Sequence, residues 1–219
     1  MIKRSFLAFL IIIFLSTYNS SNYKNFYSIF DIKEIRIKNN DIVNESKILK
    51  DLFFLYGSNI LFLNSSQIKR TFDKIEIIDS FEISKIYPNI IEIKIFEKKP
   101  VAIIQYKKKK FYFTEQSDLI NYFNHNQYNN LPIVFGKKEN FEIFYEKLKS
   151  INFPIHLINK FYLFESNRWD ILIEKDTTIK LPVENFSESL KNFMEIKDKS
   201  NFNKYDIFDY RINGQLILK

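Results

Sequence analysis

Strand-like and helix-like hydrophobic patterns follow one another in the first half of the chain. In residues 90–96, three isoleucines alternate with charged residues, which is typical of a strand with one buried face. Residues 30–38 and 75–86 have similar patterns. Because proline cannot donate a hydrogen bond to a sheet, Pro88 indicates a turn between the last two of these strands.

Between residues 38 and 75, the hydrophobic spacing changes to that of amphipathic helices. We expect a first helix to begin near Asn44 and to end at Gly57, a C-cap position. Its buried face would carry Ile48, Leu49, Leu52, Phe53 and Tyr56. A second helix would begin at Asn64 or Ser65, with a capping-box pattern, and bury Ile68 and Phe72. Two helices on one face of a three-stranded sheet would bury the apolar sides of both.

From residue 99 onward the pattern indicates a second domain, made of short strands and two helices. The expected strands are 101–106, 111–114, 119–123, 131–135, 161–164, 169–174, 178–181, 205–212 and 215–218, and the helices are 139–149 and 187–197. Asn213-Gly214 predicts a tight hairpin between the last two strands, because both residues tolerate positive φ. The fold class is therefore α+β.

Specific residues in the first domain resemble the POTRA module of the FtsQ/DivIB family of bacterial cell-division proteins. They are Lys85, Tyr87, Pro88, Glu97, Pro100, Val101 and Ala102. In the second domain, 131–136, 168–173 with 179–182, and 207–211 are similar to further family segments. The resemblance implies a POTRA domain (β-α-α-β-β) over 30–98 and an FtsQ-type β domain over 99–219, with two helices and a C-terminal edge hairpin.

Several positions depart from the family pattern. Thr114 and Ser117 stand where the family tends to have aspartate and glycine, which suggests a different turn. Ile212 occupies a place where an aromatic residue is frequent. We therefore expect partner chemistry at that edge to differ from the family pattern.

The N-terminal residues 1–23 are expected to be a short cytoplasmic stub and a transmembrane segment. Lys3 and Arg4 precede an apolar run, and no charge follows until Lys24. Positive charge before the apolar run would keep the N-terminus in the cytoplasm and send the rest to the periplasm, with Tyr18 and Tyr23 as interfacial anchors. A cleaved signal peptide is the alternative. The resemblance implies a single-pass inner-membrane protein at the division septum.

Composition limits the chemistry that the chain can perform. It has 219 residues, 46% of them hydrophobic, and no cysteine, so disulfides and thiolate metal sites are excluded. His125 and His156 are the only histidines and are interpreted as surface residues. Three glycines are too few for a glycine-rich phosphate loop. We expect no catalytic residue, cofactor or metal.

Two further features have a structural and a functional interpretation. The formal charge of +7 is spread along the chain, and Lys107-Lys108-Lys109-Lys110 lies between aromatic residues. This run could bind single-stranded nucleic acid or anionic lipid, but we interpret it as a solvated hairpin turn and expect no nucleic-acid partner. Trp169 is interpreted as a core residue.

The C-terminal hairpin is the candidate partner-binding site. We expect its last strand to be a sheet edge that could accept a strand from a partner, although the same residues could only close the core. The candidate residues are Arg211, Ile212, Gln215, Leu216, Ile217 and Leu218. The resemblance implies FtsB- and FtsL-type division proteins, and other divisome proteins, as partners.

The resemblance further implies that the protein is a scaffold linking midcell assembly to septal peptidoglycan synthesis. A POTRA-bearing component of outer-membrane assembly or secretion is an alternative, but no long series of alternating strands follows residue 99. A periplasmic cell-wall enzyme is a second alternative, which the missing catalytic residues argue against.

Overall fold

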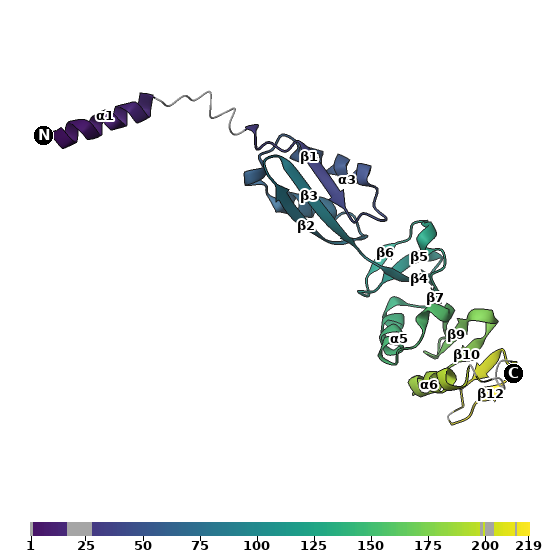
Figure 1. Ribbon diagram of the computed structural model, residues 1–219. Helices are drawn as coiled ribbons and strands as arrows, with labels where there is room; N and C mark the ends of the chain where they lie inside the picture. The colour runs from purple at the N-terminus through teal and green to yellow at the C-terminus, as the bar shows by residue number, and fades with distance from the viewer. Residues whose placement is uncertain (1, 17–27, 198, 200–203, 213) are drawn as a thin grey trace. The chain divides into compact units, whose positions relative to one another are not determined.

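The computed structural model describes residues 2–16, 28–197, 199, 204–212 and 214–219. The chain divides into two compact units, Met1–Glu97 and Lys98–Lys219, and Figure 1 labels their helices and strands where there is room. Helix α1 (Ile2–Ser16) begins the first unit. Within the described ranges, every helix is too short or too polar to cross a membrane. Tyr18 and Tyr23, the expected interfacial anchors, lie outside those ranges.

A three-stranded sheet forms the centre of the first unit. Its strands are β1 (Glu34–Lys38), β2 (Ile78–Ile86) and β3 (Ile90–Glu97), in the order β1-β3-β2. β3 is parallel to β1 and antiparallel to β2. Helices α3 (Glu45–Asp51) and α4 (Ser65–Phe72) lie between β1 and β2 in the sequence. The predicted order of strand, helix, helix, strand, strand is confirmed.

The alternating residues of β1 and β3 place their isoleucines on one face of this sheet. Ile35 is in register with Ile91 and Ile37 with Ile93, and all four are buried. The Phe72 ring of α4 packs edge-on against Phe81 of β2, with ring centroids 4.9 Å apart. The apolar face of the sheet and the apolar sides of the helices therefore share one core.

The first predicted helix is shorter than its hydrophobic pattern suggests. α3 ends at Asp51, and a 3-10 helix, η1 (Phe53–Leu55), follows it. A 3-10 helix has three residues per turn, fewer than an α-helix, so different side chains face the core. In this segment the buried side chain is that of Leu55. Phe53 is 72% exposed and Tyr56 37% exposed, so the prediction that both are buried is wrong.

The Glu97 side chain, at the end of β3, forms hydrogen bonds with the loop before α3. Its carboxylate accepts hydrogen bonds from the backbone N–H of Ile42, at 2.9 and 3.0 Å, and of Val43, at 2.8 Å. Hydrogen bonds to a charged acceptor are stronger than neutral ones. This contact explains a glutamate at the end of the strand.

A nine-stranded mixed sheet forms the second unit, in the order β12-β11-β10-β9-β8-β7-β4-β5-β6. The first six strands in the sequence are β4 (Pro100–Tyr106), β5 (Lys109–Thr114), β6 (Leu119–Asn121), β7 (Ile133–Phe135), β8 (Ile158–Leu163) and β9 (Trp169–Ile173). The last three are β10 (Thr178–Lys180), β11 (Ile207–Asp209) and β12 (Ile217–Leu218).

The two helices of this unit connect parallel neighbours. α5 (Lys138–Ser150) joins β7 to β8, and α6 (Phe186–Ile196) joins β10 to β11. Parallel neighbours need a crossover connection, which explains why these helices interrupt the strands. Trp169 is 6% exposed and stacks on Phe144 of α5 at 4.9 Å, which confirms it as a core residue.

Gly136 lies where the main chain passes close to two core side chains. A Cβ at this position would lie 3.0 Å from Leu163 Cβ and 3.2 Å from the Trp169 ring. The packing of β7 against β8 and β9 therefore leaves little room for a side chain at this position.

Several turns in this unit have a non-glycine residue in the left-handed backbone region. Lys107 and Lys108, with φ of 46° and 66°, form the two-residue loop between Tyr106 and Lys109, as predicted for a hairpin turn. Ser117 has a φ of 64°, and the Thr114 hydroxyl accepts from the Asp118 N–H at 3.1 Å. Ser117 thus adopts a conformation that a glycine would adopt freely.

Candidate functional site

The last two strands of the second unit form one edge of its sheet. β12 is outermost and pairs antiparallel with β11. Lys219 and Ile207 exchange two backbone hydrogen bonds of 3.0 and 3.1 Å. Because bonded and non-bonded positions alternate in an antiparallel pair, the N–H and C=O of Leu218 point away from β11. The edge therefore offers backbone groups to an added strand.

Both strands are shorter than the predicted 205–212 and 215–218. β11 ends at Asp209, and the Arg211 N–H donates to the Asp209 carboxylate at 3.1 Å. Gly214 has a φ of 72°, as expected of a turn glycine. Asn213, the other residue of the predicted turn, lies outside the described residues.

The hydrophobic residues at this edge divide into two groups. Leu216 and Leu218 are partly buried and pack against the core of the second unit. Ile212 and Ile217 are 51% and 37% exposed. Leu216 and Leu218 therefore close the core, whereas Ile212 and Ile217 face solvent and are accessible to a partner.

Arg211 has a structural partner within its own strand region. Its Nε and Nη2 donate to the Asp209 carboxylate at distances from 2.6 to 3.0 Å. Asp209 is 4% exposed. Hydrogen bonds from Arg211 hold the pKa of this carboxyl below its usual range, although burial acts in the opposite direction. Arg211 therefore compensates a buried charge.

Asp209 belongs to a row of charged residues across three strands. Lys180 of β10 is in register with Asp209 of β11 on one side and with Asp170 of β9 on the other. Arg168 donates to Asp170, whose pKa burial raises despite the nearby Arg168 charge. Two arginine-aspartate pairs thus flank one lysine. The charged residues of the segments 168–173 and 207–211 belong to these two pairs.

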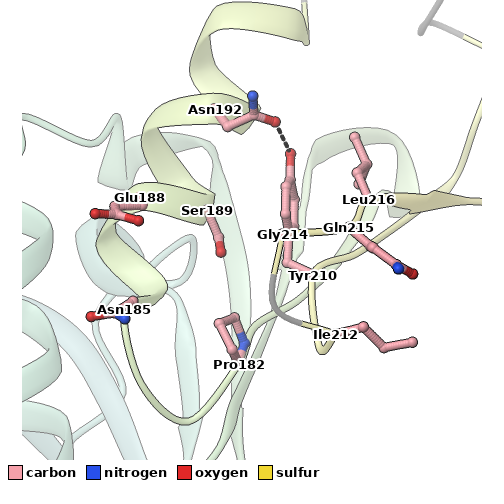
Figure 2. A pocket seen from close by; sticks show the side chains of 10 residues that line it. All are labelled: Pro182, Asn185, Glu188, Ser189, Asn192, Tyr210, Ile212, Gly214, Gln215 and Leu216. Carbon is pink, nitrogen blue, oxygen red and sulfur yellow. Dashed lines mark hydrogen bonds between the residues drawn. The ribbon is translucent and has the colours of Figure 1, made fainter.

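A pocket of about 290 Å³ adjoins the edge, between α6 and residues 210–216 (Figure 2). Its lining is Pro182, Asn185, Glu188, Ser189, Asn192, Tyr210, Ile212, Gly214, Gln215 and Leu216. The Tyr210 hydroxyl donates to Asn192 Oδ1 at 2.9 Å, and burial raises the pKa of Tyr210. Amide and hydroxyl groups next to an open edge can bind the backbone of a peptide.

Three of the six predicted site residues line this pocket, namely Ile212, Gln215 and Leu216. The α6 residues of the lining were not predicted, because α6 lies about twenty residues before the hairpin and its hydrophobic pattern indicates only its buried face. In the sequence, the signal is the pair of polar residues Glu188 and Asn192, on the face opposite Leu190 and Phe193.

The other candidate residues have local structural contacts. His125 Nδ1 accepts a long hydrogen bond from the Gln127 N–H at 3.4 Å, and His156 is exposed in a 3-10 turn. Lys107 and Lys110 lie over the rings of Tyr106 and Tyr122. Across the described ranges, His, Asp and Glu side chains form no cluster that could hold a metal ion.

Residues 30–98 match the family model of the POTRA domain, FtsQ-type. The cell division protein FtsQ of Rickettsia conorii is 30% identical over 188 residues, which are 83% of this chain and 69% of that protein. FtsQ of Rickettsia bellii is 32% identical over 177 residues, 78% of this chain and 64% of that protein. The alignments thus span about two thirds of each relative.

One solved structure is also similar in part. It is the major extracytoplasmic domain of the trans isomer of the bacterial cell division protein DivIB from Geobacillus stearothermophilus. The match covers 45% of this chain and 89% of that one, at 10% identity and a TM-score of 0.32. This score is too low to carry any conclusion about the fold.

Proposed function

This chain belongs to the FtsQ/DivIB family of bacterial cell division proteins, and we propose that it is a non-catalytic scaffold of the divisome. Its partners are FtsB- and FtsL-type division proteins, which bind the C-terminal edge of the second unit. The second unit is then an FtsQ-type β domain, over residues 99–219.

The observation that carries this proposal is the open edge at β12. The backbone of Leu218 points outward, and Ile217 offers an exposed apolar side chain beside it. An extended partner segment gains affinity from main-chain hydrogen bonds along such an edge and specificity from side-chain contacts. Ile212 and Gln215, at the neighbouring pocket, lie where such a segment would continue.

The six candidate residues then have different roles. Ile212, Gln215 and Ile217 contact the partner, whereas Leu216 and Leu218 hold β12 on the core and supply its backbone. Arg211 holds Asp209 and so fixes the end of β11. Substitution of Arg211 would therefore affect binding through the shape of the edge.

Residues 30–98 serve as the POTRA domain that helps to place the complex at midcell and links it to septal peptidoglycan synthesis. Residues 1–23 anchor the chain in the inner membrane, with the N-terminus in the cytoplasm and both units in the periplasm. The uncharged stretch 5–23 has 19 residues, close to the roughly 20 that span a bilayer.

The test is binding of the full chain to the extracytoplasmic segments of FtsB- and FtsL-type proteins from the same genome. Ile217→Lys places a charge at the edge, and we expect it to weaken binding about tenfold or more, since a desolvated lysine opposes strand addition. Isothermal titration calorimetry measures the change in Kd.

Leu119→Lys is the matched control, because Leu119 lies on β6, the opposite edge of the same sheet, and is 39% exposed against 37% for Ile217. This variant should bind as the wild type does. Equal weakening by both substitutions, or by neither, would move the site away from β12.

A further inference from the structure

Exposed apolar side chains gather at one end of the first unit. They include Ile29, Phe53, Tyr56, Phe62, Ile86 and Tyr87, which we call the N-proximal patch. Phe62 is 78% exposed, and Phe53 is 72% exposed. In residues 28–97, every exposed large hydrophobic side chain lies within 29, 53–62 or 86–87. Large exposed apolar patches of this kind mark interaction sites.

Backbone contacts bring the three segments of the patch together. Ile60 N donates to Phe30 O at 2.9 Å, which places residue 29 beside the 3-10 helix η2 (Ile60–Phe62). Lys85 Nζ donates to Leu61 O at 3.4 Å, which brings the end of β2 to the same place. The Phe53 and Tyr56 rings lie 5.9 Å apart.

The opposite end of the sheet is polar. Exposed residues there include Asp41, Lys74, Glu76 and Asp79. The two ends are about 27 Å apart, the rise of β2 from residue 78 to residue 86. The apolar surface is therefore restricted to the end at which the chain arrives from α1.

The length of chain before the patch limits where it can lie. Residues 17–27 separate α1 from residue 28. Eleven residues reach at most about 40 Å. If α1 is inserted in a bilayer, as the proposed function requires, the N-proximal patch stays within this distance of the membrane surface.

The composition of the patch suits the interfacial region of a bilayer. Aromatic rings are favoured at the level of the lipid headgroups, and lysines beside them interact with anionic lipid. Tyr56, Phe62 and Tyr87 supply rings, and the exposed Lys33 and Lys85 supply the cations. Asp31, Glu34 and Asp51 lie nearby, and Glu34 is paired with Arg36, so apolar insertion contributes more than charge.

We propose that the N-proximal patch docks the first unit on the phospholipid bilayer, with its aromatic side chains at the headgroup level. This inference rests on the membrane anchorage in the proposed function. Docking would fix which end of the unit faces the membrane and keep the polar end away from it.

The test uses the full chain in vesicles of phosphatidylethanolamine and phosphatidylglycerol that carry nitroxide-labelled lipids. The chain has no cysteine, so Ser65→Cys, next to the patch, and Asp79→Cys, at the polar end, each take one fluorophore. We expect the lipids to quench the label at residue 65 and not the label at residue 79.

Adding Phe62→Ser with Tyr87→Ser should reduce quenching at residue 65 to the level seen at residue 79. Leu119→Ser with Ile143→Ser, two exposed positions of the second unit, is the control and should leave quenching unchanged. Circular dichroism checks that both variants are folded.

Flotation of the vesicles separates this inference from the proposed function. If the wild type does not float with lipid, the anchor and the docking both fail. If it floats but the label at residue 65 is not quenched, or both labels are quenched equally, docking through the patch is wrong.

Discussion

At the candidate edge, Asp209 and Arg211 form an ion pair that stabilises the fold, and any effect of theirs on partner binding is indirect. The Asp209 carboxylate is buried and depends on the arginine for compensation. On the same segment, Tyr210 points into the pocket wall and Arg211 stays largely exposed. Neighbouring residues of one short segment therefore support the edge in different ways.

Replacing Asp209 should change how stability depends on pH. Its pKa is lowered in the folded protein, so the ionised carboxylate stabilises the fold above its ordinary pKa of about 3.9. This contribution is lost as the pH falls through the lower folded value. Asp209→Asn should cost about 1 to 3 kcal/mol at pH 7, and the difference from the wild type should shrink toward pH 3.

Urea unfolding followed by Trp169 fluorescence measures the free energies of unfolding of the wild type and of Asp209→Asn, because Trp169 is buried in the same unit. The raised pKa of Asp170 acts in the opposite direction but is common to both proteins and cancels in the difference. A difference that stays constant from pH 7 to pH 3 would contradict the assignment to Asp209.

Tyr210→Phe removes the hydroxyl that donates to Asn192. Because Tyr210 is 7% exposed, we expect a loss of about 0.5 to 1.5 kcal/mol in the free energy of unfolding. Tyr122→Phe, at a 37% exposed ring, is the control and should change stability by less than about 0.5 kcal/mol. Similar losses in both variants would mean that the hydrogen bond in the pocket wall adds nothing.

At the scale of elements, the ends of strands and helices decide which surfaces are exposed. The change from α3 to η1 turns Phe53 and Tyr56 outward and so creates part of the N-proximal patch. The crossover helix α6 places its polar face beside residues 210–216 and forms one wall of the pocket. Both surfaces result from where an element ends or crosses.

Glu97→Ala should destabilise the first unit. Its carboxylate accepts two backbone N–H groups across 54 and 55 residues of sequence, so truncation leaves these donors unpaired and should cost about 1 to 3 kcal/mol. Glu92→Ala on the same strand should cost less than about 0.5 kcal/mol. Urea unfolding followed by far-ultraviolet circular dichroism compares them, and equal losses would argue against the anchoring role of Glu97.

At the scale of the whole molecule, the proposed roles divide between the two units. Partner recruitment belongs to the β12 edge of the second unit, whereas membrane contact and placement at midcell belong to the first unit. A substitution at the β12 edge should therefore leave the roles of the first unit intact.

Ile217→Lys in cells should reduce recruitment of the FtsB- and FtsL-type proteins but leave the protein itself at the septum. Fluorescence microscopy of tagged proteins in a strain that depends on the variant measures both positions. Loss of the variant itself from the septum would show that recruitment and placement share one surface.

The sequence by itself determined the local features of this protein. Periodicity predicted the strands of the first unit and the helix that begins at residue 65, because burial of one face requires a fixed spacing. The position of Trp169 at the start of a strand predicted it as a core residue. Family-like residues such as Glu97 and Pro100 identified the family, since they occur at characteristic positions in the sequence.

Only the tertiary structure decided what depends on distant residues. The bonds from Glu97 to Ile42 and Val43, the row from Asp170 through Lys180 to Asp209, and the pocket between α6 and residues 210–216 all join separate segments. The outward rotation of Phe53 and Tyr56 depended on where α3 ended. Hydrophobic spacing indicates which face of a helix or strand is buried. The pairing of strands and the ends of helices depend instead on packing across the whole unit.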